Sequence, residues 1–327
     1  MLRVVCALLA LIGLQLAPFA GIGQALAEWA PKKTVKFIVM AGKGGGADKA
    51  TRYLVDVIKT KKLAPVDFEI INMPGNSGAD ALSALKKASG DPHVLLFTLN
   101  SFYTAPIDHP EIGVDIKNFT PVARLAEDVF LLWVNAERTD IETIDDFVKA
   151  AKAKGKNWVM AGTGVGAEDN LLTDFLNGQY GLNMTYKDKG GGGEVAKELA
   201  EKRADSTVNN PSEQDEFYPK GITKPILAFT PKRLPAYPVQ PALRETGMDF
   251  SYFMQRSVVA AGGLKGEEAQ YWSALFQRIY DSDDWKSYAK ANSLSGDFLT
   301  GDKLMAYWLT EREKHVRWKA ALQLMKP

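Results

Sequence analysis

Apolar runs alternate with amphipathic runs along most of this chain. Short apolar runs predict buried strands, and apolar residues spaced three or four apart predict helices. The predicted strands cover residues 35–39, 67–72, 93–98, 130–134, 207–212, 225–230 and 251–260. The predicted helices cover residues 50–60, 79–88, 144–154, 194–202, 265–280 and 302–324, and a further helical run follows residue 168. This alternation predicts βα units and an α/β fold with mainly parallel sheets.

Two similar glycine-rich turns occur along the chain, the first between a predicted strand and a predicted helix and the second at the start of a further helical run. The first contains Lys43, Gly44, Gly45, Gly46 and Asp48, and the second contains Gly162, Thr163, Gly164, Val165 and Gly166. The first N–H groups of a helix have no partner inside it and carry partial positive charge. Glycine lets a ligand approach that backbone closely. Each turn is therefore a candidate anion site, and together they predict two lobes that hold a negatively charged ligand between them.

Two other interpretations of these turns are open. Either turn could serve only tight packing of a strand against a helix. Both turns also fit the pattern G-x-G-x-x-A, which is typical of dinucleotide-binding proteins. That pattern needs an acid at the end of the second strand, and Glu69 is near this place, but the strand continues past it to Asn72. We therefore favour a small anion over a dinucleotide.

Polar and aromatic residues at other strand ends extend the candidate site. Ligands of open α/β sheets bind beyond the carboxyl ends of the strands, which selects Asn100, Ser101 and Phe102. Arg256 lies on the strand predicted for residues 251–260, where it either clamps a carboxylate with two hydrogen bonds or pairs with a nearby acid. Lys43 is either a solvated charge or a ligand contact. Asp48 either stabilises the helix dipole or contacts the ligand.

The N-terminal segment predicts export. Arg3 precedes an almost wholly apolar run, and a small-x-small sequence ends at Ala27, so residues 1–27 are typical of a secretory signal peptide and not of a membrane anchor. Cleavage after Ala27 would leave 39 basic and 39 acidic residues and would remove Cys6, the single cysteine. A neutral chain without cysteine excludes disulfides and thiolate metal ligands and gives no basic surface for nucleic acid. We expect a soluble periplasmic protein.

Catalytic chemistry finds little support in the sequence. His93, His109 and His315 are isolated from one another, and no metal-binding or nucleophile motif occurs around them. We therefore expect no enzyme, no metal and no cofactor. An exported enzyme that uses the same cleft, and a receptor that feeds a sensor kinase, remain the alternatives.

Several motifs in a fixed order resemble those of one family. They are Gly44 to Asp48, Asn72 to Gly78, Asp115 to Ala123, Tyr186 with Lys187, Asn210 with Ser212, Thr230 to Arg233 and Pro238 to Gly247. The mature chain resembles the substrate-binding proteins of tripartite tricarboxylate transporters, also called Bug receptors. The resemblance adds Tyr186, Lys187 and Asn210 to the candidate ligand-binding residues. Lys43, Lys189 and the run Gly190 to Gly193 depart from the usual family pattern.

The resemblance implies a two-lobe periplasmic-binding-protein (Venus flytrap) fold with two crossing strands. It also implies closure on a carboxylate held by backbone amides, and delivery to membrane transporter subunits. We expect lobe I to comprise residues 28–128 and 250–327, with the last helix packed on it, and lobe II to comprise residues 129–249. The predicted function is a monomeric exported receptor for an organic carboxylate, either a dicarboxylate or an aromatic acid.

Overall fold

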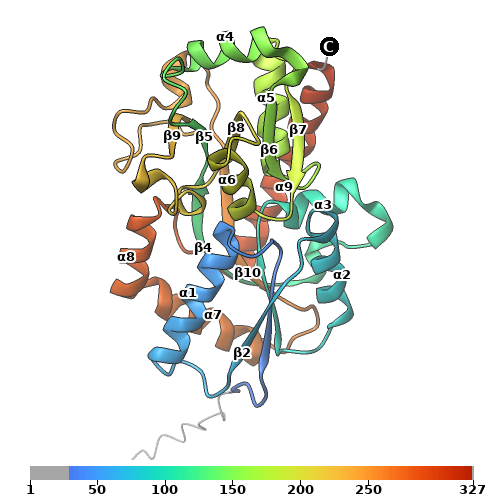
Figure 1. Ribbon diagram of the computed structural model, residues 1–327. Coiled ribbons are helices and arrows are strands. Elements are labelled where there is room, and N and C mark those ends of the chain that lie inside the picture. Colours follow the sequence, from blue (N-terminus) through green and yellow to red (C-terminus); the bar gives the residue numbers. More distant parts are fainter. Residues whose placement is uncertain (1–28, 326–327) are drawn as a thin grey trace, which may run out of the picture.

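The computed structural model describes residues 29–325 and contains two five-stranded sheets, one above the other in Figure 1. The predicted signal peptide lies outside these residues. The first sheet has the strand order β2 (Phe68–Asn72), β1 (Val35–Val39), β3 (Val94–Thr98), β10 (Phe253–Ala260), β4 (Thr120–Val129). The second has the order β7 (Thr185–Lys189), β6 (Val159–Thr163), β8 (Ser206–Asn209), β5 (Leu131–Asn135), β9 (Thr223–Ala228). The predicted two-lobe α/β fold is confirmed.

Strand direction follows the same rule in both sheets. β1 pairs in parallel with β2 and β3, and β6 pairs in parallel with β7 and β8. β10 runs antiparallel to β3 and β4, and β5 runs antiparallel to β8 and β9. Four strands of each sheet therefore point one way, as the alternation of strands and helices predicted. The reversed strand in each sheet is the one that arrives from the other sheet.

Helices flank both sheets in Figure 1. Those around the first sheet are α1 (Gly46–Thr60), α2 (Ala79–Lys87), α3 (Ser101–Asp108), α7 (Gly266–Tyr280) and α8 (Asp283–Ala291). Those around the second are α4 (Ile144–Lys154), α5 (Glu168–Tyr180) and α6 (Gly192–Ala200). Thr143 caps α4, since its Oγ1 accepts a hydrogen bond from the Asp146 N–H at 3.2 Å and Asp146 Oδ2 accepts one from the Thr143 N–H at 3.0 Å. This reciprocal arrangement is a capping box, which pairs N–H groups that the start of the helix leaves unpaired.

Two connections join the sheets. Only Phe130 separates β4 from β5, and the return passes through residues 229–252. The Phe229 N–H donates to the Phe130 carbonyl, and the Tyr252 N–H donates to the Phe229 carbonyl, each at 2.9 Å. The two connections are therefore tied to each other at the point where they cross.

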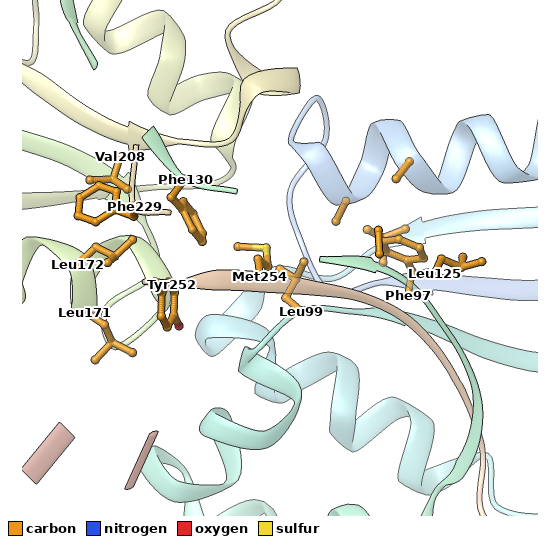
Figure 2. Packing of buried hydrophobic residues seen from close by; sticks show 14 of the residues in the cluster. Phe97, Leu99, Leu125, Phe130, Leu171, Leu172, Val208, Phe229, Tyr252 and Met254 are labelled. Carbon is orange, nitrogen blue, oxygen red and sulfur yellow. The ribbon is translucent and has the colours of Figure 1, made fainter. Parts of the chain in front are cut away.

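One hydrophobic core continues through this crossing. Figure 2 shows part of it along β10, with Phe130, Phe229, Tyr252, Leu171, Leu172 and Val208 toward the second sheet, Met254 and Leu99 between, and Phe97 and Leu125 toward the first sheet. All of these side chains are buried. Burial of apolar side chains on both sides of the crossing stabilises the relative placement of the two sheets.

The last helix, α9 (Gly301–Met325), serves both halves. Its first part packs on the first sheet, where Trp308 is buried against Phe102 with ring centroids 4.6 Å apart. Its second part reaches α5, where the Trp318 ring lies 6.5 Å from that of Phe175. The prediction that this helix packs on lobe I therefore covers only part of its contacts, because α9 is long enough to reach α5 beside the second sheet. Within residues 29–325, none of the helices combines the length and apolarity that crossing a membrane requires.

Two helices were not predicted. Asn100, Ser101 and Phe102 were interpreted as a strand end that faces a ligand, but α3 begins inside them, at Ser101. No helix was predicted between residues 280 and 302, but Ser282 caps the start of α8, where its Oγ accepts from the Trp285 N–H at 3.2 Å. Asp283 and Asp284 lie in the first turn of α8, where acidic residues are favourable, and this pattern was overlooked.

Candidate ligand-binding site

A cavity of about 930 Å³ is lined by residues that follow strands of both sheets. It is bordered by the turn after β1, the turn after β6 and the glycine run after β7. The predicted site residues in its lining are Gly45, Gly46, Ser101, Thr163, Gly164, Val165, Gly166, Asn210 and Arg256. The structure thus brings the two glycine turns to one cavity, although they lie far apart in the sequence.

Main-chain contacts between the turns show that the two halves are closed on each other. A Cβ built on Gly42 would lie 2.0 Å from the carbonyl oxygen of Gly190, and one on Gly193 would lie 2.8 Å from that of Gly44. Ser77 Oγ, beside the first sheet, donates to the Val165 carbonyl at 2.8 Å. Only glycine permits such approach of two backbones. The glycines after β1 and β7 therefore form a contact surface between the halves.

Acidic side chains of the second half cap helices of the first half. Glu213 Oε1 accepts a hydrogen bond from the Gly46 N–H at 3.0 Å, at the start of α1. Glu168 Oε1 accepts one from the Ser101 N–H at 2.8 Å, at the start of α3. Both carboxylates occupy places that favour an anion, because helix N-termini carry unpaired N–H groups and partial positive charge. Two of the anion positions at this cavity are therefore filled by the protein itself.

Arg256 forms a buried ion pair. Its Nε donates to Asp128 Oδ2 at 2.9 Å, and its terminal nitrogens contact the same carboxylate and Asn210 Oδ1, the latter at 3.0 Å. Burial raises the pKa of Asp128 to about 6, and the neighbouring Arg256 limits the rise. Of the two roles left open for Arg256, the structure shows the pairing with an acid. Its side chain still lines the cavity.

The other predicted site residues lie outside the cavity lining: Lys43, Gly44, Asp48, Asn100, Phe102, Gly162, Tyr186 and Lys187. Lys43 and Lys187 are exposed side chains. Phe102 is buried in the first-sheet core, because the first turn of α3 directs it away from the cavity.

Asp48 and Tyr186 lie outside the cavity lining but form hydrogen bonds to the glycine turns that border the cavity. Asp48 accepts hydrogen bonds from the Gly44 N–H at 3.0 Å, from Arg52 Nε at 3.0 Å and from Asn72 Nδ2 at 2.9 Å. These bonds outweigh its burial and hold the pKa of Asp48 below its ordinary value. The Tyr186 hydroxyl donates to the Thr163 carbonyl. Asp48 and Tyr186 thereby fix the conformations of the first and second glycine turns.

Asn100 supports the site in the same way, from the end of β3. Its Nδ2 donates to the Phe253 carbonyl at 2.8 Å, and its Oδ1 accepts from the Gln255 N–H at 3.0 Å. It therefore ties the start of α3 to β10. These backbone-directed bonds explain the polar character of the position without a ligand contact.

Sequence reasoning missed the acids of the cavity wall. Glu168, Asp169 and Glu213 are buried and line the cavity. Asp169 Oδ2 accepts from the Thr163 N–H at 2.8 Å, and burial, strengthened by Glu213, raises the pKa of Asp169 well above its ordinary value. Glu168 and Asp169 follow the second glycine turn within three positions. Their nearness to a candidate anion site in the sequence was the signal that could have identified them. Glu213 is remote from both turns, and no local pattern marks it.

Two α/β sheets joined by two crossing connections, with a cavity between their glycine turns, define a periplasmic binding protein. A family model described as the tripartite tricarboxylate transporter family receptor (TctC) matches residues 52–270, and the chain belongs to this family. The family consists of solute-binding receptors, so the chain is a transport receptor and not an enzyme.

Individual relatives agree with this placement. The chain is 22% identical to Protein BugT of Bordetella pertussis over 295 residues, which cover 88% of each chain. Among solved structures it is similar to the periplasmic binding protein BugD, with a TM-score of 0.81 at 19% identity, covering 90% of this chain and 98% of that one.

Two further similar structures contain ligands. R. palustris Rpa4515 with adipate has a TM-score of 0.81 at 20% identity, covering 90% of this chain and 98% of that one. MatC from Rhodopseudomonas palustris with bound malate has a TM-score of 0.77 at 22% identity, covering 89% and 99%. At these identities the likeness establishes the fold.

Proposed function

We propose that this receptor captures an organic carboxylate in the 930 Å³ cavity and delivers it to the membrane subunits of a tripartite tricarboxylate transporter in the periplasm. The observation that carries the proposal is that the first turns of α1 and α5, one from each half, line the same cavity. First-turn N–H groups such as those of Ala47 and Asn170 have no partner inside their helices and suit carboxylate oxygens.

The closed contacts and the two connections support a hinge mechanism. The lobes are residues 28–128 with 250–327, and residues 129–249, and they rotate about the crossing at Phe130. Closure places the turns against each other, as Gly42 and Gly190 lie in the structure, and it shields the ligand from water. Hinge closure around a ligand is a common device of such receptors. Cleavage after Ala27 releases the mature receptor.

The relatives that bind adipate and malate favour an aliphatic dicarboxylate or hydroxy acid as the ligand class. The size of the cavity admits such molecules together with bridging waters. We extend the class to aromatic acids because the volume leaves room for a ring. The turns recognise the carboxylate, and the rest of the wall selects the remainder of the molecule.

Titration calorimetry of the purified protein with mono-, di- and aromatic carboxylates tests this proposal. At least one acid should bind with one-to-one stoichiometry and raise the unfolding temperature. Gly45→Val should abolish that binding, because a side chain there meets the Gly192 backbone nitrogen 3.3 Å from the Cβ position. Gly266→Val is the matched control, since nothing lies within 4 Å of its Cβ position. Failure of every carboxylate to bind, or equal binding by the Gly45 variant, would contradict the proposal.

A further inference from the structure

The turn Gly75–Gly78, between β2 and α2, holds two successive residues in the left-handed region of backbone conformation. Asn76 has a φ of 50° and Ser77 has a φ of 51°. Residues other than glycine are uncommon in this region, and each one costs free energy that the surrounding structure must offset. Contacts around the turn must therefore hold Asn76 and Ser77 in this conformation.

Asn76 is supported within its own half of the protein. Asparagine tolerates the left-handed region better than most residues, and Asn76 Nδ2 donates a hydrogen bond to Asp80 Oδ1 at 2.9 Å. A backbone bond within the same turn runs from the Gly78 N–H to the Pro74 carbonyl at 3.3 Å. Neither bond involves a polar group of Ser77, so the support of Ser77 must come from elsewhere.

Ser77 is held from the opposite half. Its Oγ donates to the carbonyl of Val165, in the second glycine turn, at 2.8 Å. A Cβ built on Gly164 would lie 2.5 Å from Ser77 Oγ and 3.2 Å from Ser77 Cβ, so the serine side chain lies directly against the backbone of that turn. Ser77, Gly164 and Val165 all line the cavity. These contacts therefore join the two halves where they meet at the cavity.

The contacts of Ser77 and its backbone strain depend on the same arrangement of the halves. When the halves separate, the hydrogen bond to Val165 and the packing on Gly164 are lost, while the bond from Asn76 to Asp80 remains. The left-handed conformation of Ser77 then has no contact with the opposite half to offset its cost, and the backbone can relax. Strained positions of this kind gather at ligand clamps and switch regions.

We propose that Ser77 is a strained latch. Closure of the halves forms its hydrogen bond to Val165 and forces its backbone into the left-handed region, and opening breaks the bond and releases the strain. The hydrogen bond slows opening and the strain speeds it, so this one residue sets how fast the receptor releases its ligand. The inference rests on the proposed function for that ligand, but the latch joins two parts of the protein and acts with or without a bound acid.

Two substitutions of Ser77 separate the hydrogen bond from the strain. Ser77→Ala removes the hydroxyl and keeps a side chain that disfavours the left-handed region, whereas Ser77→Gly removes both the hydroxyl and the strain. Ser77→Ala should lower the ratio of closed to open protein by about three- to tenfold, the value of one hydrogen bond. Ser77→Gly should have a ratio about threefold higher than that of Ser77→Ala. Equal ratios in the two variants would overturn the link between strain and closure.

Spin labels on Lys87→Cys in α2 and Gln179→Cys in α5 measure closure in solution. Both side chains are exposed, lie in opposite halves and are outside the cavity lining. Cys6, the single cysteine of the sequence, belongs to the predicted signal peptide. Double electron–electron resonance of the ligand-free protein should show that Ser77→Ala increases the population at longer distances. A distance distribution that Ser77→Ala leaves unchanged would overturn the latch, whether or not any acid binds.

Release of a bound acid gives the functional readout. Stopped-flow tryptophan fluorescence, with adipate or malate as the probe, measures the dissociation rate. Ser77→Ala should raise this rate about three- to tenfold, and Ser77→Gly should raise it less. An unchanged rate in Ser77→Ala would overturn the role of the latch in release. Failure of every carboxylate to bind would contradict the proposed function instead, and the distance measurement would still decide the latch.

Two matched controls lie within the first half. Ser89 Oγ donates to the Gly262 carbonyl at 3.2 Å, so Ser89→Ala removes an equivalent bond that does not cross the cavity. Lys62 is exposed, has a φ of 52° and lies outside the cavity lining, so Lys62→Gly relieves similar strain elsewhere. Neither control should change the distance distribution or the dissociation rate. A change in either control as large as that in the Ser77 variants would overturn the assignment of the latch to Ser77.

Discussion

If the ligand is held in the closed arrangement, adding one methyl group at Gly42 should strongly reduce ligand affinity. The Cβ of Gly42→Ala would lie 2.0 Å from the carbonyl oxygen and 2.7 Å from the carbonyl carbon of Gly190, in the opposite half. Cβ atoms do not approach such atoms closer than 3.0 Å. The two turns must therefore separate by about 1 Å before the halves can meet.

The size of the expected loss in ligand affinity follows from the free-energy cost of overpacking a contact. Forcing extra atoms into a close-packed contact costs about 1–3 kcal/mol, and binding that requires closure loses this amount. The affinity should fall by about 5- to 150-fold. The three atoms nearest to the new Cβ belong to Gly190 and Gly191, so each half should fold as before. The unfolding midpoint of the ligand-free protein should change little.

Titration calorimetry with the tightest carboxylate of the panel measures this loss. Gly266→Ala serves as the control, because its Cβ position has no atom within 4 Å, and it should bind as the wild type does. An affinity of Gly42→Ala within twofold of the wild type would refute the view that the ligand is held in the closed arrangement. A comparable loss in Gly266→Ala would point to a general effect of replacing glycine.

Three further predictions concern stability. Asp128→Asn leaves the buried Arg256 without its anionic partner and should lower the free energy of unfolding by about 3–5 kcal/mol in urea titrations; a loss below about 1 kcal/mol would contradict the role of the pair. Burial raises the pKa of Asp169 in the folded state, so the free energy of unfolding should fall progressively as the pH rises above the ordinary pKa of 3.8. The stability of Asp169→Asn relative to the wild type should therefore grow with pH in urea titrations. A stability difference that shrinks with pH would show that the pKa is shifted the other way. Thr143→Ala removes the α4 cap and should cost about 1 kcal/mol of stability while leaving ligand affinity unchanged, which denaturation and calorimetry together check.

The strands and most helices could be predicted because they depend on local pattern. The apolar run Val35–Val39, the spacing of apolar residues in α1 and the Thr143 cap each carry their information within a few positions. α3 was missed because its polar and aromatic start resembles a ligand-facing loop and Pro106 interrupts it. Local patterns thus describe elements well where one face of each element is clearly apolar.

The cavity could be predicted only in part, because its details depend on contacts between remote segments. Helix starts after glycine turns are visible in the sequence, and both turns line the cavity. The bond from the Gly46 N–H to Glu213 joins residues 167 positions apart, and nothing near either one indicates it. Asn100 was selected for its place at a strand end and Tyr186 through the family resemblance, but their polar groups hydrogen-bond to backbone carbonyls and lie outside the cavity lining.

A crystal structure with the tightest carboxylate bound tests the central claim most directly. The account predicts that its carboxylate oxygens lie within about 3.2 Å of first-turn N–H groups of both α1 and α5, inside the cavity that Gly45 and Gly164 line. A ligand bound elsewhere, or one that contacts the first turn of only one of these helices, would contradict it.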